Sequence, residues 1–184
     1  MRATGLEKFR AAVEGFCKKR PGLWCAPSTE FKHWLCSERL PAWLERHLLS
    51  ACLARTTHVG LAYFYSPARI RRENRAYPEI KKAGFFQIGS AFDGDPLVVQ
   101  FQGNRRSVGY LSSDALWRDR EDREVEFLQV AESLGDYAAM AKNIEGCPID
   151  FYGTMPERVA QPGCSSGRAD CVHVAFGRPL SARH

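Results

Sequence analysis

The sequence from residue 84 to residue 99 reads Gly84-Phe85-Phe86-Gln87-Ile88-Gly89-Ser90-Ala91-Phe92-Asp93-Gly94-Asp95-Pro96-Leu97-Val98-Val99. It contains an apolar run, a short polar loop and a second apolar run, and a third run follows soon after. The predicted strands are Gly84–Ser90, Leu97–Phe101 and Val108–Leu111. Short apolar runs bounded by turn residues are typical of strands. Because such close neighbours pair most economically in the antiparallel sense, they predict the centre of an antiparallel sheet.

The polar loop Asp93-Gly94-Asp95 is best explained as a turn. An Asp side chain can bond to nearby backbone, glycine supplies a positive φ, and Pro96 can only begin a strand. We therefore assign Gly89, Gly94 and Pro96 to structural turns. The alternative is that Asp93 and Asp95 share a hard cation in a small metal-dependent hydrolase. A calcium loop needs several further oxygen ligands at fixed positions, and none follows here.

Helical patterns flank these strands. Thr4 and Glu7 have the spacing of a capping box, and the helix they begin is predicted to end at Pro21-Gly22. The other predicted helices lie near 29–37, after Pro41 with apolar residues up to Leu53, from Ser66-Pro67 to Tyr77-Pro78, and at 132–143. Further strands are predicted at 59–64, 124–130, 149–152 and 171–176.

Charge is distributed unevenly along the chain. The net charge is +5, but residues 1–82 contain 16 Lys and Arg against 7 Asp and Glu, whereas residues 83–145 contain 6 against 11. Such asymmetry can attract partners, although a solvated surface explains it as well. The helix after Ser66 is expected on the surface, with its arginines outward: Arg69, Arg71, Arg72 and Arg75. Nucleic-acid binding is disfavoured because no recognised motif accompanies this stripe.

Composition indicates a cytoplasmic globular protein. No run of about 18 apolar residues appears, and the first residues lack the apolar stretch of a secretory signal. No membrane association is therefore expected. The seven cysteines are expected to be reduced. We expect one α+β domain at 1–145 and a C-terminal extension at 146–184, which is rich in Gly, Pro, Cys and Ser.

Other chemistry has weaker support in the sequence. A four-ligand zinc site is an alternative for four side chains of the extension: Cys147, Cys164, Cys171 and His173. Structural zinc sites usually use tight Cys-x-x-Cys pairs, and none is present. The five histidines are scattered, and no Gly-x-Ser-x-Gly motif marks a nucleophile.

The stretch Gly84–Val99 resembles the SUKH superfamily, which contains the fungal cell-wall-assembly regulator and many bacterial immunity proteins. Members show an apolar strand, a glycine, a short polar loop ending in Gly-Asp, and a second apolar strand. Other segments are similar in the same order, and the resemblance covers about residues 40–145. These segments are Leu40-Pro41 before a helix, Leu61–Ile70, Val108–Asp114 and Val130–Tyr137.

The resemblance implies an α+β fold with an antiparallel sheet of about four to six strands and helices around it. It also implies a protein-binding role without catalytic residues or a cofactor. The partner would be another protein, such as a cognate toxin neutralised by direct contact. A regulatory scaffold is the alternative. We predict partner contacts in the loops around 93–96 and 111–117, with these residues: Phe92, Asp93, Asp95, Tyr110, Asp114 and Trp117.

Overall fold

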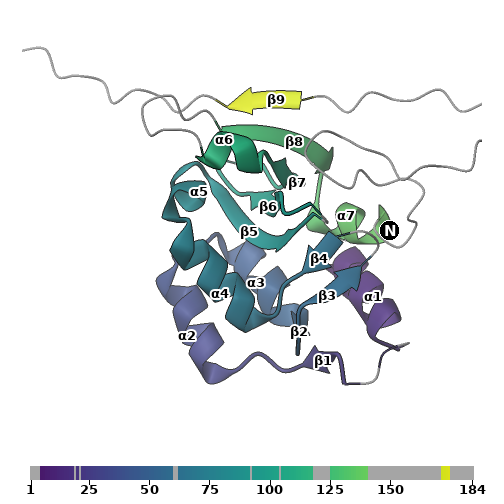
Figure 1. Ribbon diagram of the computed structural model, residues 1–184. Helices are drawn as coiled ribbons and strands as arrows, with labels where there is room; N and C mark the ends of the chain where they lie inside the picture. Colours follow the sequence, from purple (N-terminus) through teal and green to yellow (C-terminus); the bar gives the residue numbers. More distant parts are fainter. Residues whose placement is uncertain are drawn as a thin grey trace, which may run out of the picture.

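The computed structural model shows an α+β protein with two antiparallel sheets and helices packed around them (Figure 1). Of the 184 residues, it describes 5–18, 20, 22–59, 62–91, 93–103, 105–117, 125–140 and 171–174. The α+β class predicted from the sequence is confirmed. Among the described residues, no helix combines the length and the apolar character that crossing a bilayer requires.

The larger sheet contains seven strands within the described part of the chain, in the order β3-β4-β5-β6-β7-β8-β9, and every neighbouring pair is antiparallel. The bounds are Thr57–Val59 (β3), Ala62–Phe64 (β4), Phe85–Ser90 (β5), Pro96–Gln100 (β6), Val108–Leu111 (β7), Val125–Ala131 (β8) and Cys171–Val174 (β9). The three strands predicted at the centre are therefore confirmed. A small sheet pairs β1 (Trp24–Cys25) with β2 (Cys52–Leu53).

The central strands are buried throughout because both faces of the sheet are covered. Phe86 and Ile88 belong to a large core with α1, α2, α3 and α7, whereas Phe85 belongs to a second core with Ile80 and Leu116. Antiparallel sheets often leave one face in water and then alternate apolar and polar residues. Here β5, β6 and β7 are buried at every position, so their runs are nearly continuous.

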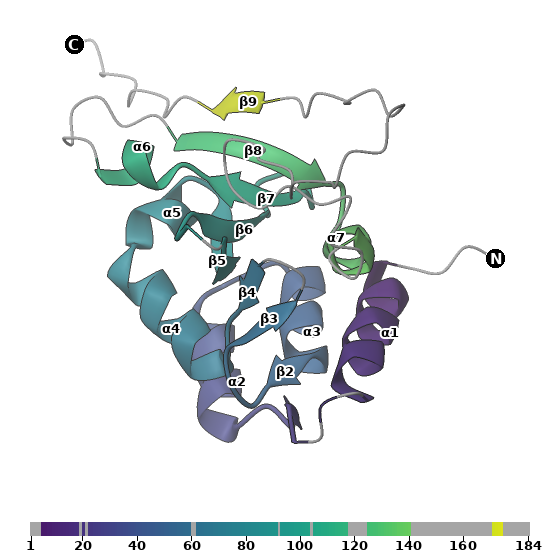
Figure 2. The same ribbon diagram turned by 45° about the vertical axis from the view of Figure 1, so that its right-hand side comes forward.

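The described helices are α1 (Gly5–Lys18), α2 (Thr29–Ser37), α3 (Ala42–Ser50), α4 (Pro67–Ala76), α5 (Pro78–Lys82), α6 (Ser113–Trp117) and α7 (Leu134–Met140). Figure 2 shows α1 and α7 together on one side of the molecule and α4 on the opposite side. Local sequence explains several of the helix starts. Ser28 caps α2 by accepting from the Phe31 N–H at 3.1 Å, and Pro67 lies in the first turn of α4.

The structure corrects three local predictions. The strand predicted at 59–64 is a hairpin, because Val59 of β3 pairs with Ala62 of β4. Cys52 and Leu53 do not continue α3 but form β2, which pairs with β1. Tyr77-Pro78 ends α4 as expected, but Pro78 then begins α5, since proline is tolerated in the first turn of a helix.

The described part of the extension, β9, pairs with the outer edge of β8. Cys171 lies opposite Leu128, and Val174 lies opposite Val125. This bears out a strand within the predicted run 171–176. The strand predicted at 149–152 lies outside the described residues.

Candidate functional site

The two loops predicted to bind a partner meet in the structure. The backbone N–H of Ser113, at the start of α6, donates to Asp95 Oδ1 at 2.9 Å. Within the β5–β6 loop, Asp93 Oδ1 accepts from the Asp95 N–H at 3.1 Å. Both carboxylates therefore bond to backbone, which supports their interpretation as turn residues. The bond from Ser113 to Asp95 also joins the β5–β6 loop to α6.

The turn residues occupy positions that suit them. Gly94 has a φ of +110°, where a Cβ atom is disfavoured, and Pro96 begins β6. Gly89 lies within β5 rather than at its end. A Cβ atom there would lie 2.2 Å from the Tyr63 carbonyl oxygen, so glycine allows β4 to approach.

A pocket of about 180 Å³ opens where these loops face α4, and we name it the α4 pocket. Its walls come from α4, α5, β5, the β5–β6 loop and α6. The apolar lining is Tyr65, Tyr77, Ile80, Pro96 and Leu116. The polar lining includes Arg69, Glu73, Gln87, Ser90 and Ser113. At about 30 Å³ per water molecule, the space is that of about six waters, which is the scale of one large side chain.

Gln87 and Ser90 are the polar residues of β5 that line the pocket, and only 4% of the Gln87 surface is exposed. Its Nε2 donates to the Gly89 carbonyl at 3.2 Å. Its Oε1 is buried and has no hydrogen-bond partner among the described residues. Buried polar atoms are nearly always paired, because an unpaired one costs about 1–3 kcal/mol. Gln87, which lines the pocket, therefore carries a buried acceptor that lacks a donor in the described part of the chain.

The backbone of Gln87 is held by α4. Asn74 Oδ1 accepts from the Gln87 N–H at 3.0 Å, and Asn74 Nδ2 donates to the Gln87 carbonyl at 2.8 Å. The same Nδ2 donates to the Ile70 carbonyl at 2.8 Å. The position of Gln87 is therefore set by its backbone contacts with α4, independently of its own side chain.

One wall of the pocket is charged. Glu73, whose side chain is 16% exposed, accepts from Arg72 Nη2 at 2.7 Å and lies 3.3 Å from Arg69 Nε. The Arg69 guanidinium lies over the Tyr65 ring, 4.1 Å from its centroid. A planar guanidinium is suited to such stacking on aromatic rings. Two arginines share one carboxylate, so the wall keeps an excess of positive charge.

The six residues predicted to contact a partner lie in different environments in the structure. Asp93 and Asp114 are exposed near the pocket loops, whereas Asp95 is 3% exposed. Tyr110 is fully buried, and its hydroxyl lies 2.8 Å from that of Tyr137. Tyr110 and Asp95 therefore stabilise the fold and do not form its surface. Phe92 lies outside the described residues, and only the backbone of Trp117 is described, at the end of α6.

Sequence reasoning missed the residues that line the pocket itself. Its one available signal was Gln87, a polar residue between Phe86 and Ile88 in an otherwise apolar strand. Nothing in the pattern indicated that Tyr65 and Arg69 approach it, because they belong to a segment about 20 residues earlier.

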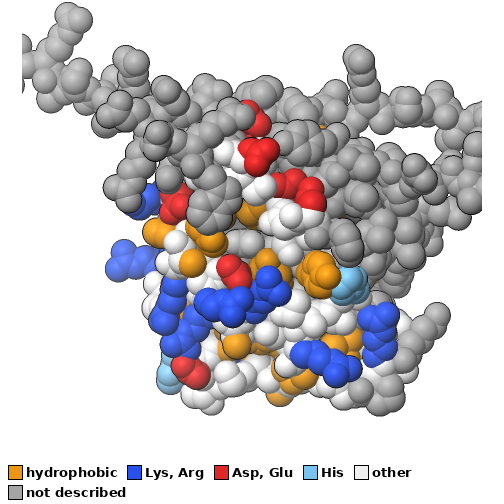
Figure 3. Space-filling model, in the orientation of Figure 1, with side chains coloured by type: hydrophobic (Ala, Val, Ile, Leu, Met, Phe, Trp, Pro, Cys, Tyr) orange, Lys and Arg blue, Asp and Glu red, His pale blue; other side chains and the backbone are white. Residues whose placement is uncertain are grey.

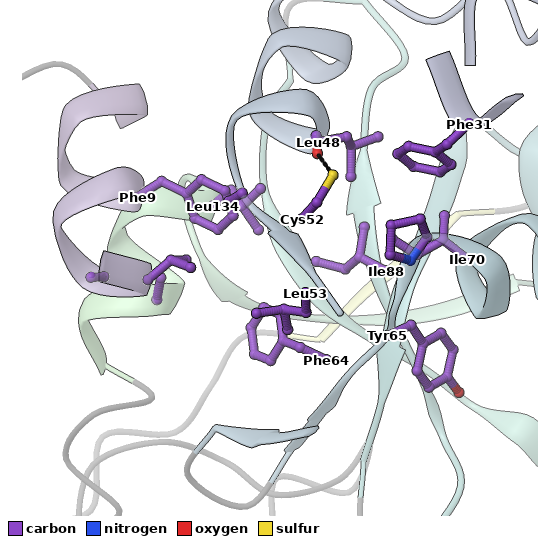
Figure 4. A pocket seen from close by; sticks show the side chains of 15 residues that line it. Phe9, Phe31, Leu48, Cys52, Leu53, Phe64, Tyr65, Ile70, Ile88 and Leu134 are labelled. Atoms are coloured by element: carbon purple, nitrogen blue, oxygen red, sulfur yellow. Dashed lines mark hydrogen bonds between the residues drawn. The ribbon is translucent and has the colours of Figure 1, made fainter. Parts of the chain in front are cut away.

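A second cavity, of about 50 Å³, lies inside the larger core (Figure 4). Apolar side chains from α1, α3, β2, β4 and α4 point into it, among them Phe9, Phe64 and Ile70. The thiol of Cys52 donates to the Leu48 carbonyl at 3.3 Å, and burial raises its pKa to about 12. A thiol with so high a pKa stays protonated near neutral pH, which lowers its reactivity.

The zinc alternative is not resolved by the described residues. Cys147 and Cys164 lie outside them, and Cys171 and His173 are described only as backbone of β9. Within the described ranges, no three His, Cys, Asp or Glu side chains are grouped closely enough to hold a metal ion.

Comparison with protein-family models finds no match, and comparisons with curated proteins and with solved structures find none either. The SUKH resemblance therefore remains a prediction made from residues 84–99 and their surroundings.

Proposed function

We propose that this protein is a protein-binding module and that its partner docks on the α4 pocket and on the exposed arginines beside it. The observation that carries the proposal is the buried Oε1 of Gln87, which has no partner among the described residues, beside a pocket the size of one large side chain. A partner side chain that inserts a hydrogen-bond donor there forms a hydrogen bond and, in the same contact, buries its own apolar surface. Interface anchors combine these two features.

The surface around the pocket favours an acidic partner. Figure 3 shows a band of Lys and Arg side chains over the part of this face where α4 runs in Figure 1. The four arginines of α4 are Arg69, Arg71, Arg72 and Arg75. The ion pairs that join them to carboxylates involve Glu73 and Glu30, so positive charge is in excess. Complementary charge steers the association of two proteins and disfavours binding to wrong partners.

The resemblance to SUKH proteins suggests the biological class of the partner. Bacterial members of that superfamily are taken to neutralise toxins by direct contact. We therefore propose an immunity-type role, in which the partner is a toxin with an acidic docking surface. The buried acceptor and the basic band support binding in general, and the resemblance supports this particular class.

The test is a binding titration with the product of the reading frame adjacent to the one that encodes this chain. We expect a 1:1 complex by light scattering and calorimetry, weakened by salt because the facing charges are screened. The double variant Arg72→Glu/Arg75→Glu should weaken binding about tenfold or more.

The matched control is Arg10→Glu/Lys18→Glu on α1, on the opposite side of the molecule, which changes net charge equally. It should change affinity less than about threefold, as expected of charges away from an interface. Equal weakening by both variants would place the docking surface elsewhere. A failure of the neighbouring product to bind at low salt would contradict the immunity-type role.

A further inference from the structure

The amide group of Gln87 has one orientation that suits its surroundings. The Gly89 carbonyl can only accept a hydrogen bond, so the amide nitrogen of Gln87 must point toward it. The amide oxygen is then left on the other side of the group, without a donor from any residue that the structure describes. A flipped amide would bring two oxygen atoms together. The contact with Gly89 therefore determines which amide atom of Gln87 is left unpaired in the structure.

This acceptor is within reach of an incoming group. The last torsion of a glutamine side chain has a broad energy minimum, and the bond that restrains it, to Gly89, is long at 3.2 Å. Because Oε1 is buried in the structure, an incoming donor would have to draw it toward the pocket that Gln87 lines by rotating this torsion. The backbone does not need to move, because Asn74 holds it independently.

The residues that line the pocket determine which kind of side chain fits it. Tyr65, Tyr77, Ile80 and Leu116 provide aromatic and aliphatic surface. Arg69, already stacked on Tyr65, is a group that also packs well on aromatic ligands. Small polar side chains would leave this apolar surface uncovered. An aliphatic or phenylalanine side chain would cover it but would leave Gln87 Oε1 without a donor.

The charges exclude a cationic donor. Arg69 and Arg72 both lie at Glu73, so the one carboxylate among the described lining residues is already shared by two guanidinium groups. A lysine or arginine from a partner would meet like charge there. The remaining class is a neutral aromatic ring with a hydrogen-bond donor at its edge.

We infer that the α4 pocket receives a tyrosine or tryptophan side chain of the partner protein, whose O–H or N–H donates to Gln87 Oε1. Buried Tyr and Trp side chains usually find such a partner for their polar edge. This inference rests on the proposed protein-binding function, since a partner supplies the side chain.

The experiment uses the full chain labelled with ¹⁵N and titrated with three probes: N-acetyl-tyrosinamide, N-acetyl-tryptophanamide and N-acetyl-phenylalaninamide. Amide shifts should be concentrated at Gly89, Ser90, Gly94 and Ser113, with dissociation constants on the order of 1 mM, which is typical of such small ligands. The phenylalanine probe, which lacks the donor, should bind about three- to tenfold more weakly than the tyrosine probe, as one hydrogen bond predicts.

The decisive variant is Gln87→Met, which keeps the approximate shape of the side chain and removes the acceptor. It should abolish the preference for tyrosine over phenylalanine, while unchanged shifts elsewhere in the spectrum show that the fold is intact. Equal binding of tyrosine and phenylalanine probes to the unaltered chain would overturn the inference. So would the absence of pocket shifts at probe concentrations of about 20 mM, well above the expected dissociation constant.

Failure of this inference can be separated from failure of the proposed function. If the neighbouring protein binds as tightly to Gln87→Met as to the unaltered chain, the inference is wrong and the protein-binding function stands. If the aromatic probes bind with the expected preference but the protein partner does not associate, the pocket assignment stands and the immunity-type role is wrong.

Discussion

The side chain of Asn74 in α4 takes the place of a neighbouring strand for Gln87 in β5. Its amide accepts from the Gln87 N–H at 3.0 Å and donates to the Gln87 carbonyl at 2.8 Å. This is necessary because β4 pairs with β5 only at Gly89 and Ser90. Tyr65 still donates its N–H to the Ile88 carbonyl, and the chain then leaves the sheet to form α4. One side chain thereby satisfies two buried backbone groups and fixes α4 beside the pocket.

We predict that Asn74→Ala destabilises the fold by about 2–4 kcal/mol, because it leaves the two backbone groups of Gln87 without partners. Chemical denaturation followed by circular dichroism measures this difference. The control is Arg75→Ala, the exposed next residue of α4, which should stay within about 0.5 kcal/mol of the unaltered chain. Equal effects of the two variants would contradict the role assigned to Asn74.

We predict that Gly109→Ala disrupts the pairing of β7 with β8. A Cβ atom at Gly109 would lie 1.9 Å from the Leu128 carbonyl oxygen, so the two strands would have to separate. The loss of stability should be about 3 kcal/mol or more, in the range that marks severe local disruption. Gly103→Ala provides the comparison. Its φ of +66° strains an alanine, but the space is open, so the cost should be only about 1–2 kcal/mol.

The strands could be predicted from sequence because their apolar runs are local, whereas the pocket depends on distant contacts. Ser66-Pro67 marked the start of α4 correctly, since capping and proline preferences involve only adjacent residues. Tyr110 was misplaced on the surface because its burial requires α7 to bring Tyr137 to its hydroxyl. The environment of Gln87 likewise depends on Asn74, which precedes it by 13 residues and lies in another element.

We predict a specific pH dependence from Asp136. The hydrogen bond from Lys8, followed by one from Ser133, lowers the pKa of Asp136 below its usual value. Because the folded pKa is lower than the unfolded one, the ionised carboxylate stabilises the fold above the unfolded pKa of about 3.9. This contribution is lost as the pH falls through the folded value.

Asp136→Asn should therefore melt below the unaltered chain near neutral pH, and the difference in melting temperature should shrink as the pH falls below about 4. Lys8→Met removes the cation that pairs with Asp136, and its difference in melting temperature should shrink in the same way. A melting difference that stays constant from neutral pH into the acid range would contradict this origin of the effect.

We predict that Glu45 slows the reaction of the exposed Cys36. The Cys36 thiol donates to Glu45 Oε1 at 3.2 Å, and this hydrogen bond raises the pKa of Cys36. In Glu45→Gln the thiolate fraction near neutral pH should rise, so alkylation by iodoacetamide should accelerate about twofold or more. Mass spectrometry of the peptide with Cys36 measures the rate. Alkylation of Cys25, whose pKa is raised by burial alone, should be unchanged.

The most direct test of the proposed docking surface is hydrogen exchange of the complex with the adjacent-frame protein. We predict that binding protects amides in peptides covering residues 69–79 and 93–98, which border the α4 pocket. Peptides of α1 and of the small sheet β1–β2 should exchange at unchanged rates. Protection confined to α1, α7 or the β1–β2 sheet, with none beside α4, would contradict the proposed surface.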